Sequence, residues 1–129
     1  MSKGRILVVD DEPDIVKSLS LRLGSVGYDV STAYDGLSAT RKAIEEQPEL
    51  IILDIGMPAG NGHVVVERLR NIVETSHIPV IYLTACTAKS DYLKAREGGV
   101  CKYITKPFDS DILLAAVDDQ ITRSRQVAP

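Results

Sequence analysis

Polar side chains that could bind a metal ion follow several short apolar runs of this sequence. The run ILVV ends in Asp10 and Asp11, and the run LIIL ends in Asp54. Two later runs end in Thr84 and just before Lys106. If these runs are parallel strands, their carboxyl ends meet at the edge of the sheet where ligands bind. Carboxylates gathered there repel one another without a cation, and such hard oxygen donors suit Mg2+.

Five apolar runs predict the strands that would carry these side chains, and five amphipathic stretches between them predict helices. The strands are expected at about 6–9, 28–33, 50–53, 78–83 and 100–104, and the helices at about 13–26, 35–46, 62–71, 87–97 and 109–123. The alternating run at 28–33 predicts an edge strand. This order predicts an α/β domain with a parallel sheet covered on both faces. The fourth helix is weakly amphipathic, so we expect it to be the least firmly docked.

The bulk composition limits the possible functions. The chain has 129 residues, so we expect one domain at 1–124 and a loose tail or the start of a linker at 125–129, within the stretch RSRQVAP. A net charge of −3 with scattered basic residues argues against a direct nucleic-acid partner. The N-terminal apolar run is too short for a signal peptide or a membrane span, so a cytoplasmic protein without a membrane partner is expected. Cys86 and Cys101 lack the partners of a zinc site, so reduced, partly buried thiols are expected.

Each polar signal has an ordinary structural explanation when it is taken alone. Acids such as Asp10 and Asp11 often precede a helix, Asp54 could be a turn residue, and Thr84 could cap the fourth helix. The combination is more informative, because all the signals fall at one edge of the predicted sheet.

Four stretches resemble the receiver domain of two-component response regulators, and together they span nearly the whole chain. They are RILVVDDEPDI, LIILDIGMP, IPVIYLTA and KYITKPFD. The resemblance implies a doubly wound (βα)5 flavodoxin-like fold with the strand order 2-1-3-4-5. It also implies a signalling switch, not an enzyme that turns over external substrates, although the domain would catalyse its own phosphorylation and dephosphorylation.

The resemblance assigns roles to the residues at the sheet edge. Asp54 would accept a phosphoryl group from a histidine kinase or a histidine phosphotransfer protein. Asp10, Asp11 and Asp54, with the backbone carbonyl of Gly56, would hold Mg2+, for which Mn2+ could substitute. Thr84 and Lys106 would bind the phosphoryl oxygens.

The same resemblance implies a conformational switch. Thr84 would move toward the phosphoryl group, and Tyr103 would rotate inward behind it. The peptide bond between Lys106 and Pro107 would be cis. The surface of the fourth helix, fifth strand and fifth helix would then change shape, and it could bind an output domain, a downstream protein or a second copy of the chain.

Small residues flank the expected phosphorylation site. Gly56 and Cys86 stand two positions after Asp54 and Thr84, where side chains in this family modulate hydrolysis of the acyl phosphate. We therefore predict an unshielded phosphoryl group with a hydrolysis rate that is not at the slow end. His63 and His77 are expected on the surface, without catalytic roles.

Two alternatives remain open at this point. A magnesium-dependent phosphatase of the haloacid dehalogenase type also uses a nucleophilic aspartate after a strand, but it needs a second acid where this chain has Gly56. A phosphorylation-independent binding module with the receiver fold is the other alternative.

Overall fold

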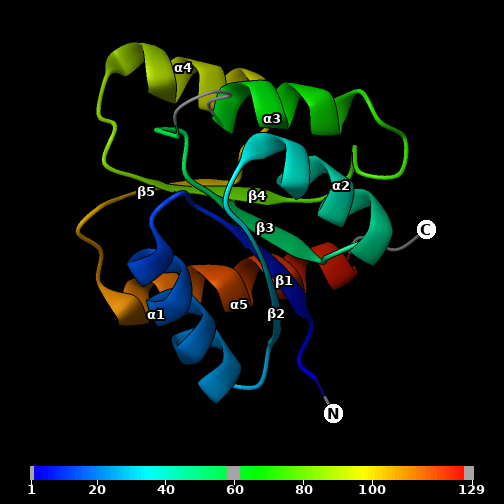
Figure 1. Ribbon diagram of the computed structural model, residues 1–129, viewed down its shortest axis with the longest axis vertical. Helices are drawn as coiled ribbons and strands as arrows, with labels where there is room; N and C mark the ends of the chain where they lie inside the picture. The colour runs from blue at the N-terminus through cyan, green and yellow to red at the C-terminus, as the bar shows by residue number, and fades with distance from the viewer. Residues whose placement is uncertain (1, 58–61, 127–129) are drawn as a thin grey trace.

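Five parallel strands form the centre of the computed structural model, which describes residues 2–57 and 62–126 (Figure 1). The strands are β1 (Arg5–Val9), β2 (Asp29–Ala33), β3 (Leu50–Leu53), β4 (Val80–Thr84) and β5 (Lys102–Thr105). Their order is β2-β1-β3-β4-β5, and every neighbouring pair is parallel. The predicted flavodoxin-like fold, its strand order and the edge position of β2 are therefore confirmed.

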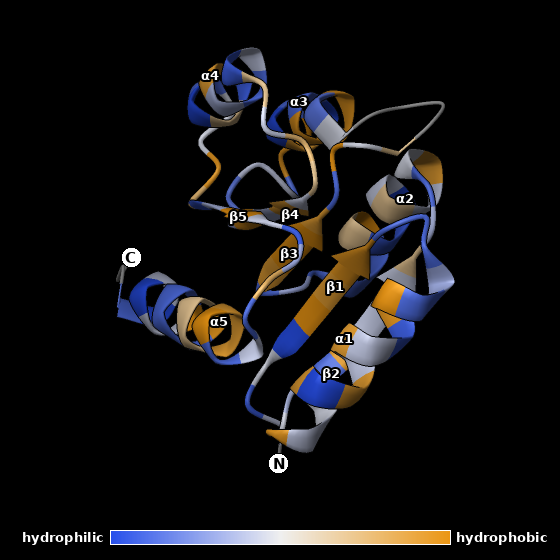
Figure 2. Ribbon diagram, turned by 90° about the vertical axis from the view of Figure 1, so that its left-hand side faces the viewer, coloured by the Kyte–Doolittle hydropathy of each residue, from blue (hydrophilic) through white to orange (hydrophobic). Residues whose placement is uncertain are grey.

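Helices cover both faces of the sheet, as Figures 1 and 2 show. The helices are α1 (Pro13–Ser25), α2 (Gly36–Glu46), α3 (Gly62–Arg70), α4 (Lys89–Glu97) and α5 (Ser110–Gln126). The pair α1 and α5 lies on one face, and α2, α3 and α4 lie on the other. The architecture is thus a three-layer α/β/α sandwich.

Alternation along the strands divides the apolar residues between two cores. Leu7 and Leu53 point into the core under α2, α3 and α4, whereas Ile6 and Ile52 point into the core under α1 and α5. Successive side chains of a strand point to opposite faces, so a strand buried on both faces must be apolar throughout. β3 meets this condition at every position, β1 meets it after the exposed Arg5, and β4 meets it up to the buried Thr84. The carboxyl ends of these strands are consequently held at fixed positions.

The helix α4 is much less buried than the other helices. Ala95 is its one buried residue, whereas Tyr92 and Leu93 are 42% and 50% exposed. No side-chain hydrogen bond caps its N-terminus at Ala88. The expectation of a weakly docked fourth helix is confirmed, although the helix begins at Lys89, two residues later than predicted.

The helix α5 is longer than predicted, and it includes part of the C-terminal segment that was expected to be loose. It runs to Gln126, and the Arg125 guanidinium donates hydrogen bonds at 2.8 Å to both carboxylate oxygens of Glu49 and a further bond to the carbonyl of Lys3. The prediction of a loose tail from residue 125 was therefore wrong for Arg125 and Gln126, which lie within this helix and are tied to Glu49 by the ion pair of Arg125. Residues 127–129 lie outside the described part, and the domain boundary after Ser124 stays a prediction.

The helices of the described residues are too short or too polar to cross a membrane.

Candidate functional site

Two carboxylates are fixed at the carboxyl edge of the sheet by the backbone of neighbouring strands. The N–H of Asp10 donates to the carbonyl of Ala33 at 3.2 Å, and the N–H of Asp54 donates to the carbonyl of Val9 at 3.0 Å. The two residues are only 2% and 6% exposed. Their acidic groups are thus presented from rigid strand ends with little conformational freedom.

Four acidic side chains converge at this edge. Asp10, Asp11, Glu12 and Asp54 each offer one carboxylate oxygen, and these oxygens all lie within 4.8 Å of one another. Oxygen donors of this kind, gathered from two adjacent loops, suit a small hard cation such as Mg2+. The structure therefore brings together the three acids that the sequence predicted as metal ligands and adds Glu12.

The ammonium of Lys106 lies among these acids. Its Nζ donates to Asp10 Oδ2 at 2.7 Å, and it lies 3.3 Å from both Asp54 Oδ2 and Glu12 Oε1. Its backbone N–H donates to the carbonyl of Thr84 at 2.8 Å, which ties the β5–α5 loop to the end of β4. The following Lys106–Pro107 peptide bond is cis, as the resemblance implied.

Burial and charge act against each other in this cluster. Burial raises the pKa of Asp10 above its ordinary value, although the hydrogen bond from Lys106 opposes the shift. Burial alone would lower the pKa of Lys106, but its bond to Asp10 and the charges of Asp10 and Asp54 raise it. One ammonium does not neutralise several carboxylates, so the site favours a further cation.

Thr84 and Tyr103 meet at the backbone of Cys86. Thr84 is fully buried at the end of β4, and its Oγ1 accepts a hydrogen bond from the Cys86 N–H at 3.2 Å. The hydroxyl of Tyr103 donates to the Cys86 carbonyl at 2.8 Å, and the half-buried ring packs edge-on against Tyr82. The two predicted switch residues thus share one backbone partner, and Tyr103 already lies inward.

The approach to Asp54 is open. A hollow of about 350 Å³ reaches the carboxylate and is lined by Gly56, Thr84 and Cys86 as well as by the charged groups. A Cβ built on Gly56 would lie 3.4 Å from both Asp54 Oδ1 and Cys86 Sγ. The N–H of Gly56 also donates to Asp54 Oδ1 at 2.8 Å. Gly56 therefore orients the carboxylate without covering it.

The structure corrects the expected place of one histidine and one cysteine. His77 is exposed, as expected, but the side chain of His63 is only 12% exposed. Its ring contacts the Tyr82 hydroxyl and the Asp91 carboxylate, contacts that no local sequence pattern could reveal. Cys86 and Cys101 are free thiols, but Cys101 is exposed and not partly buried.

Comparison with known proteins agrees with this geometry. Residues 6–118 match the response regulator receiver domain family. The chain is 39% identical over 123 residues to the DNA-binding dual master transcriptional regulator RpaA of Synechocystis sp., which covers 95% of this chain and 51% of that protein. The chain spans about half the length, or less, of the curated relatives it matches.

Solved structures give the same result. The chemotaxis protein CheY4 of Vibrio cholerae superposes with a TM-score of 0.85 and 30% identity, over 90% of this chain and 97% of that one. The BeF3-activated DrrB receiver domain superposes with a TM-score of 0.82 and 32% identity, over 95% of this chain and 100% of that one.

The fold and the acidic edge define a CheY-like α/β domain of the flavodoxin-like type. The chain belongs to the response regulator receiver domain family of two-component signalling. Membership of the receiver domain family, a family of signalling domains, argues against the haloacid dehalogenase alternative. The acidic cluster is typical of the Mg2+ site of receiver domains and is consistent with the phosphorylation site.

Proposed function

We propose that Asp54 is the phosphoryl acceptor of a phosphorylation-controlled switch. One observation carries this proposal: Asp54 Oδ2 lies 3.3 Å from the Lys106 ammonium, inside a hollow that opens to solvent. A carboxylate that is buried, oriented and still accessible can act as a nucleophile. The donor would be the phosphohistidine of a cognate histidine kinase or of a histidine phosphotransfer protein.

In the proposed step, an Asp54 oxygen attacks phosphorus while the bond from phosphorus to the imidazole nitrogen breaks. The imidazole leaves with the electron pair of that bond, and an acyl phosphate forms. Lys106 and the Thr84 hydroxyl would each bind one phosphoryl oxygen, because charge spreads over these oxygens in a loose transition state. Asp10, Asp11 and Asp54, with the Gly56 carbonyl, would hold Mg2+ or Mn2+. The bound cation would supply charge neutralisation for the acids and the incoming phosphoryl group.

The proposed output follows from the shared contact at Cys86. When the Thr84 hydroxyl turns toward the phosphoryl group, the Cys86 N–H loses its acceptor and the loop before α4 can shift. Tyr103 already lies inward, so phosphorylation would stabilise this position and the matching arrangement of α4, β5 and α5. That surface would bind an output domain or a downstream protein, or would pair two copies of the chain.

A chemical phosphorylation experiment tests this proposal. The protein would be incubated with acetyl phosphate or phosphoramidate and Mg2+, and its intact mass would be measured. The expected gain is the mass of one HPO3 unit, lost in Asp54→Ala. Asp29→Asn changes an exposed acid at the start of β2 and should leave the gain unchanged.

Two results would contradict the proposal. An unmodified wild-type mass at high donor concentration would show that Asp54 is not an acceptor. An equal mass gain in Asp54→Ala would place the phosphoryl group elsewhere and would favour the phosphorylation-independent alternative for this site.

A further inference from the structure

His63 connects three elements that are far apart in the sequence. It stands at the second position of α3, its Nδ1 lies 3.0 Å from the Tyr82 hydroxyl of β4, and its Nε2 lies 2.9 Å from Asp91 Oδ1 in the first turn of α4. Both α3 and α4 lie over the same face of the sheet, next to each other (Figures 1 and 2). A single imidazole therefore joins α3, β4 and α4.

The chemistry of these groups fixes the direction of the bond to Asp91. A carboxylate can only accept, so His63 Nε2 donates a hydrogen bond to Asp91. The second ring nitrogen, Nδ1, pairs with the Tyr82 hydroxyl. Tyr82 is fully buried, and burial raises its pKa, so its hydroxyl stays protonated. Leaving this buried hydroxyl without a partner would cost free energy, which favours the arrangement.

Two aromatic rings next to this arrangement pack against Tyr103. The Tyr103 ring packs edge-on against Tyr82, with centroids 5.8 Å apart, and lies against Tyr92 with centroids 4.1 Å apart. Tyr92 follows Asp91 directly in α4. Fixing the Tyr82 hydroxyl and Asp91 through His63 therefore fixes both rings that contact Tyr103.

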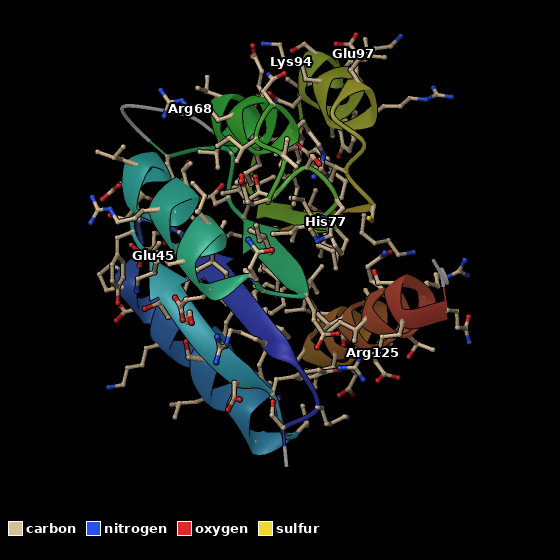
Figure 3. The ribbon with its side chains drawn as sticks, turned by 90° about the vertical axis from the view of Figure 1, so that its right-hand side faces the viewer. Glu45, Arg68, His77, Lys94, Glu97 and Arg125 are labelled. Carbon is tan, nitrogen blue, oxygen red and sulfur yellow. The ribbon has the colours of Figure 1, made fainter. Side chains whose placement is uncertain are left out.

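The first turn of α4 has little else to hold it. The helix buries Ala95 alone, and its N-terminus has no side-chain cap at Ala88. Its far end is held separately, because Arg70 of α3 donates from Nε to the Gly98 carbonyl at 3.0 Å. Figure 3 shows α3 and α4 side by side, with Lys94 and Glu97 on α4. A hydrogen bond to a charged group is worth more than a neutral one, so the bond from His63 to Asp91 is a large part of what holds this turn.

We propose that His63 is a positioning residue that latches the first turn of α4 onto α3 and β4. Through Tyr82 and Asp91 the latch holds Tyr103 in its inner position before any phosphorylation. Its influence on signalling rests on the proposed function, whereas its effect on α4 does not. Receiver output would then depend on a contact on the helical face and not only on the acidic site.

Amide hydrogen exchange of the unphosphorylated protein without Mg2+ tests the latch. The N–H groups of Asp91 and Tyr92 donate to the Ala88 carbonyl, so they report opening of this turn. In His63→Leu their exchange should become about tenfold faster, which corresponds to about 1.4 kcal/mol. Tyr82→Phe keeps the ring and removes the hydroxyl, and it should give a smaller increase in the same amides.

Matched controls and a double variant make the test specific. His77→Leu changes an exposed histidine at the amino end of the sheet, and Tyr28→Phe removes a hydroxyl beside α5; neither should alter these amides. His63→Leu combined with Asp91→Ala should exchange no faster at the Tyr92 amide than His63→Leu alone, because each variant removes one partner of the same contact. Unchanged exchange in His63→Leu, or fully additive effects in the double variant, would overturn the latch.

A second measurement separates the latch from phosphorylation. The Tyr103 ring would be followed by NMR with and without beryllium fluoride and Mg2+, a mimic of the phosphoryl group. In His63→Leu the ring should be more mobile without the mimic and should become fixed with it. Faster α4 exchange without any response to the mimic would support the latch and contradict the proposed function. A ring that is equally fixed in His63→Leu and in the wild type would contradict the latch.

Discussion

Two regions of the molecule differ sharply in how firmly they are held. One is the carboxyl edge of the strands β1 and β3, and the other is the helix α4. β3 is buried at every position, whereas α4 buries one residue and is held at its first turn by a side chain from α3. Elements with few buried contacts open with low free energies, and moving parts are drawn from them. The acids thus lie on rigid strand ends that fix their positions, whereas the proposed change of shape involves a loosely packed helix.

The largest expected effect tests this difference in stability. Ile52→Ala in β3 should lower the free energy of unfolding by about 2–5 kcal/mol, because it leaves a cavity in a closely packed core. Leu93→Ala on α4 is the matched change, and it should cost less than about 0.5 kcal/mol because Leu93 is half exposed. Equilibrium urea denaturation measures both. Similar losses at the two positions would show that α4 is packed as firmly as the central strands.

A smaller effect is expected at the open side of the acidic site. Gly56→Leu should slow hydrolysis of the Asp54 acyl phosphate by about tenfold, because a side chain there would lie over the carboxylate and exclude water. The decay of the phosphorylated protein, followed by intact mass, measures this rate. Gly24→Leu adds the same side chain in open space on α1 and should not change it. An unchanged lifetime in Gly56→Leu would mean that water reaches the acyl phosphate by another path.

The smallest effect concerns the pH response of the region beside α4. Burial, followed by the charge of Asp91, raises the pKa of Tyr103 to about 12 from the ordinary 10.0. The folded state holds the proton of the Tyr103 hydroxyl more tightly than the unfolded state does. The protonated hydroxyl therefore contributes stability that is present below about pH 10 and is lost as the pH rises toward 12. The difference in phenolate absorbance between the wild type and Tyr103→Phe should therefore appear near pH 12. Circular dichroism would check that both proteins remain folded at that pH. A difference that appears near pH 10 would mean that the Tyr103 ring is solvated and that the latch leaves it free.

Most of the fold could be predicted because its signals are local. The LIIL run before Asp54 must be apolar at each position, since a central parallel strand is covered on both faces. Element ends were less predictable. Capping side chains are local, and Asp35 begins α2 close to where it was expected, but Arg125 extends α5 through an ion pair with Glu49, which is distant in the sequence.

The sequence by itself determined the strands and the identity of the acids at their ends, because each depends on residues close together in the chain. The strand order joins distant segments, and it was available only through the family resemblance. Tertiary structure alone decided which side chains meet. It placed Glu12 beside Lys106, brought Thr84 and Tyr103 to the backbone of Cys86, and placed the His63 ring between Tyr82 and Asp91. These contacts join residues on separate elements, so their geometry exists only once the helices have packed onto the sheet.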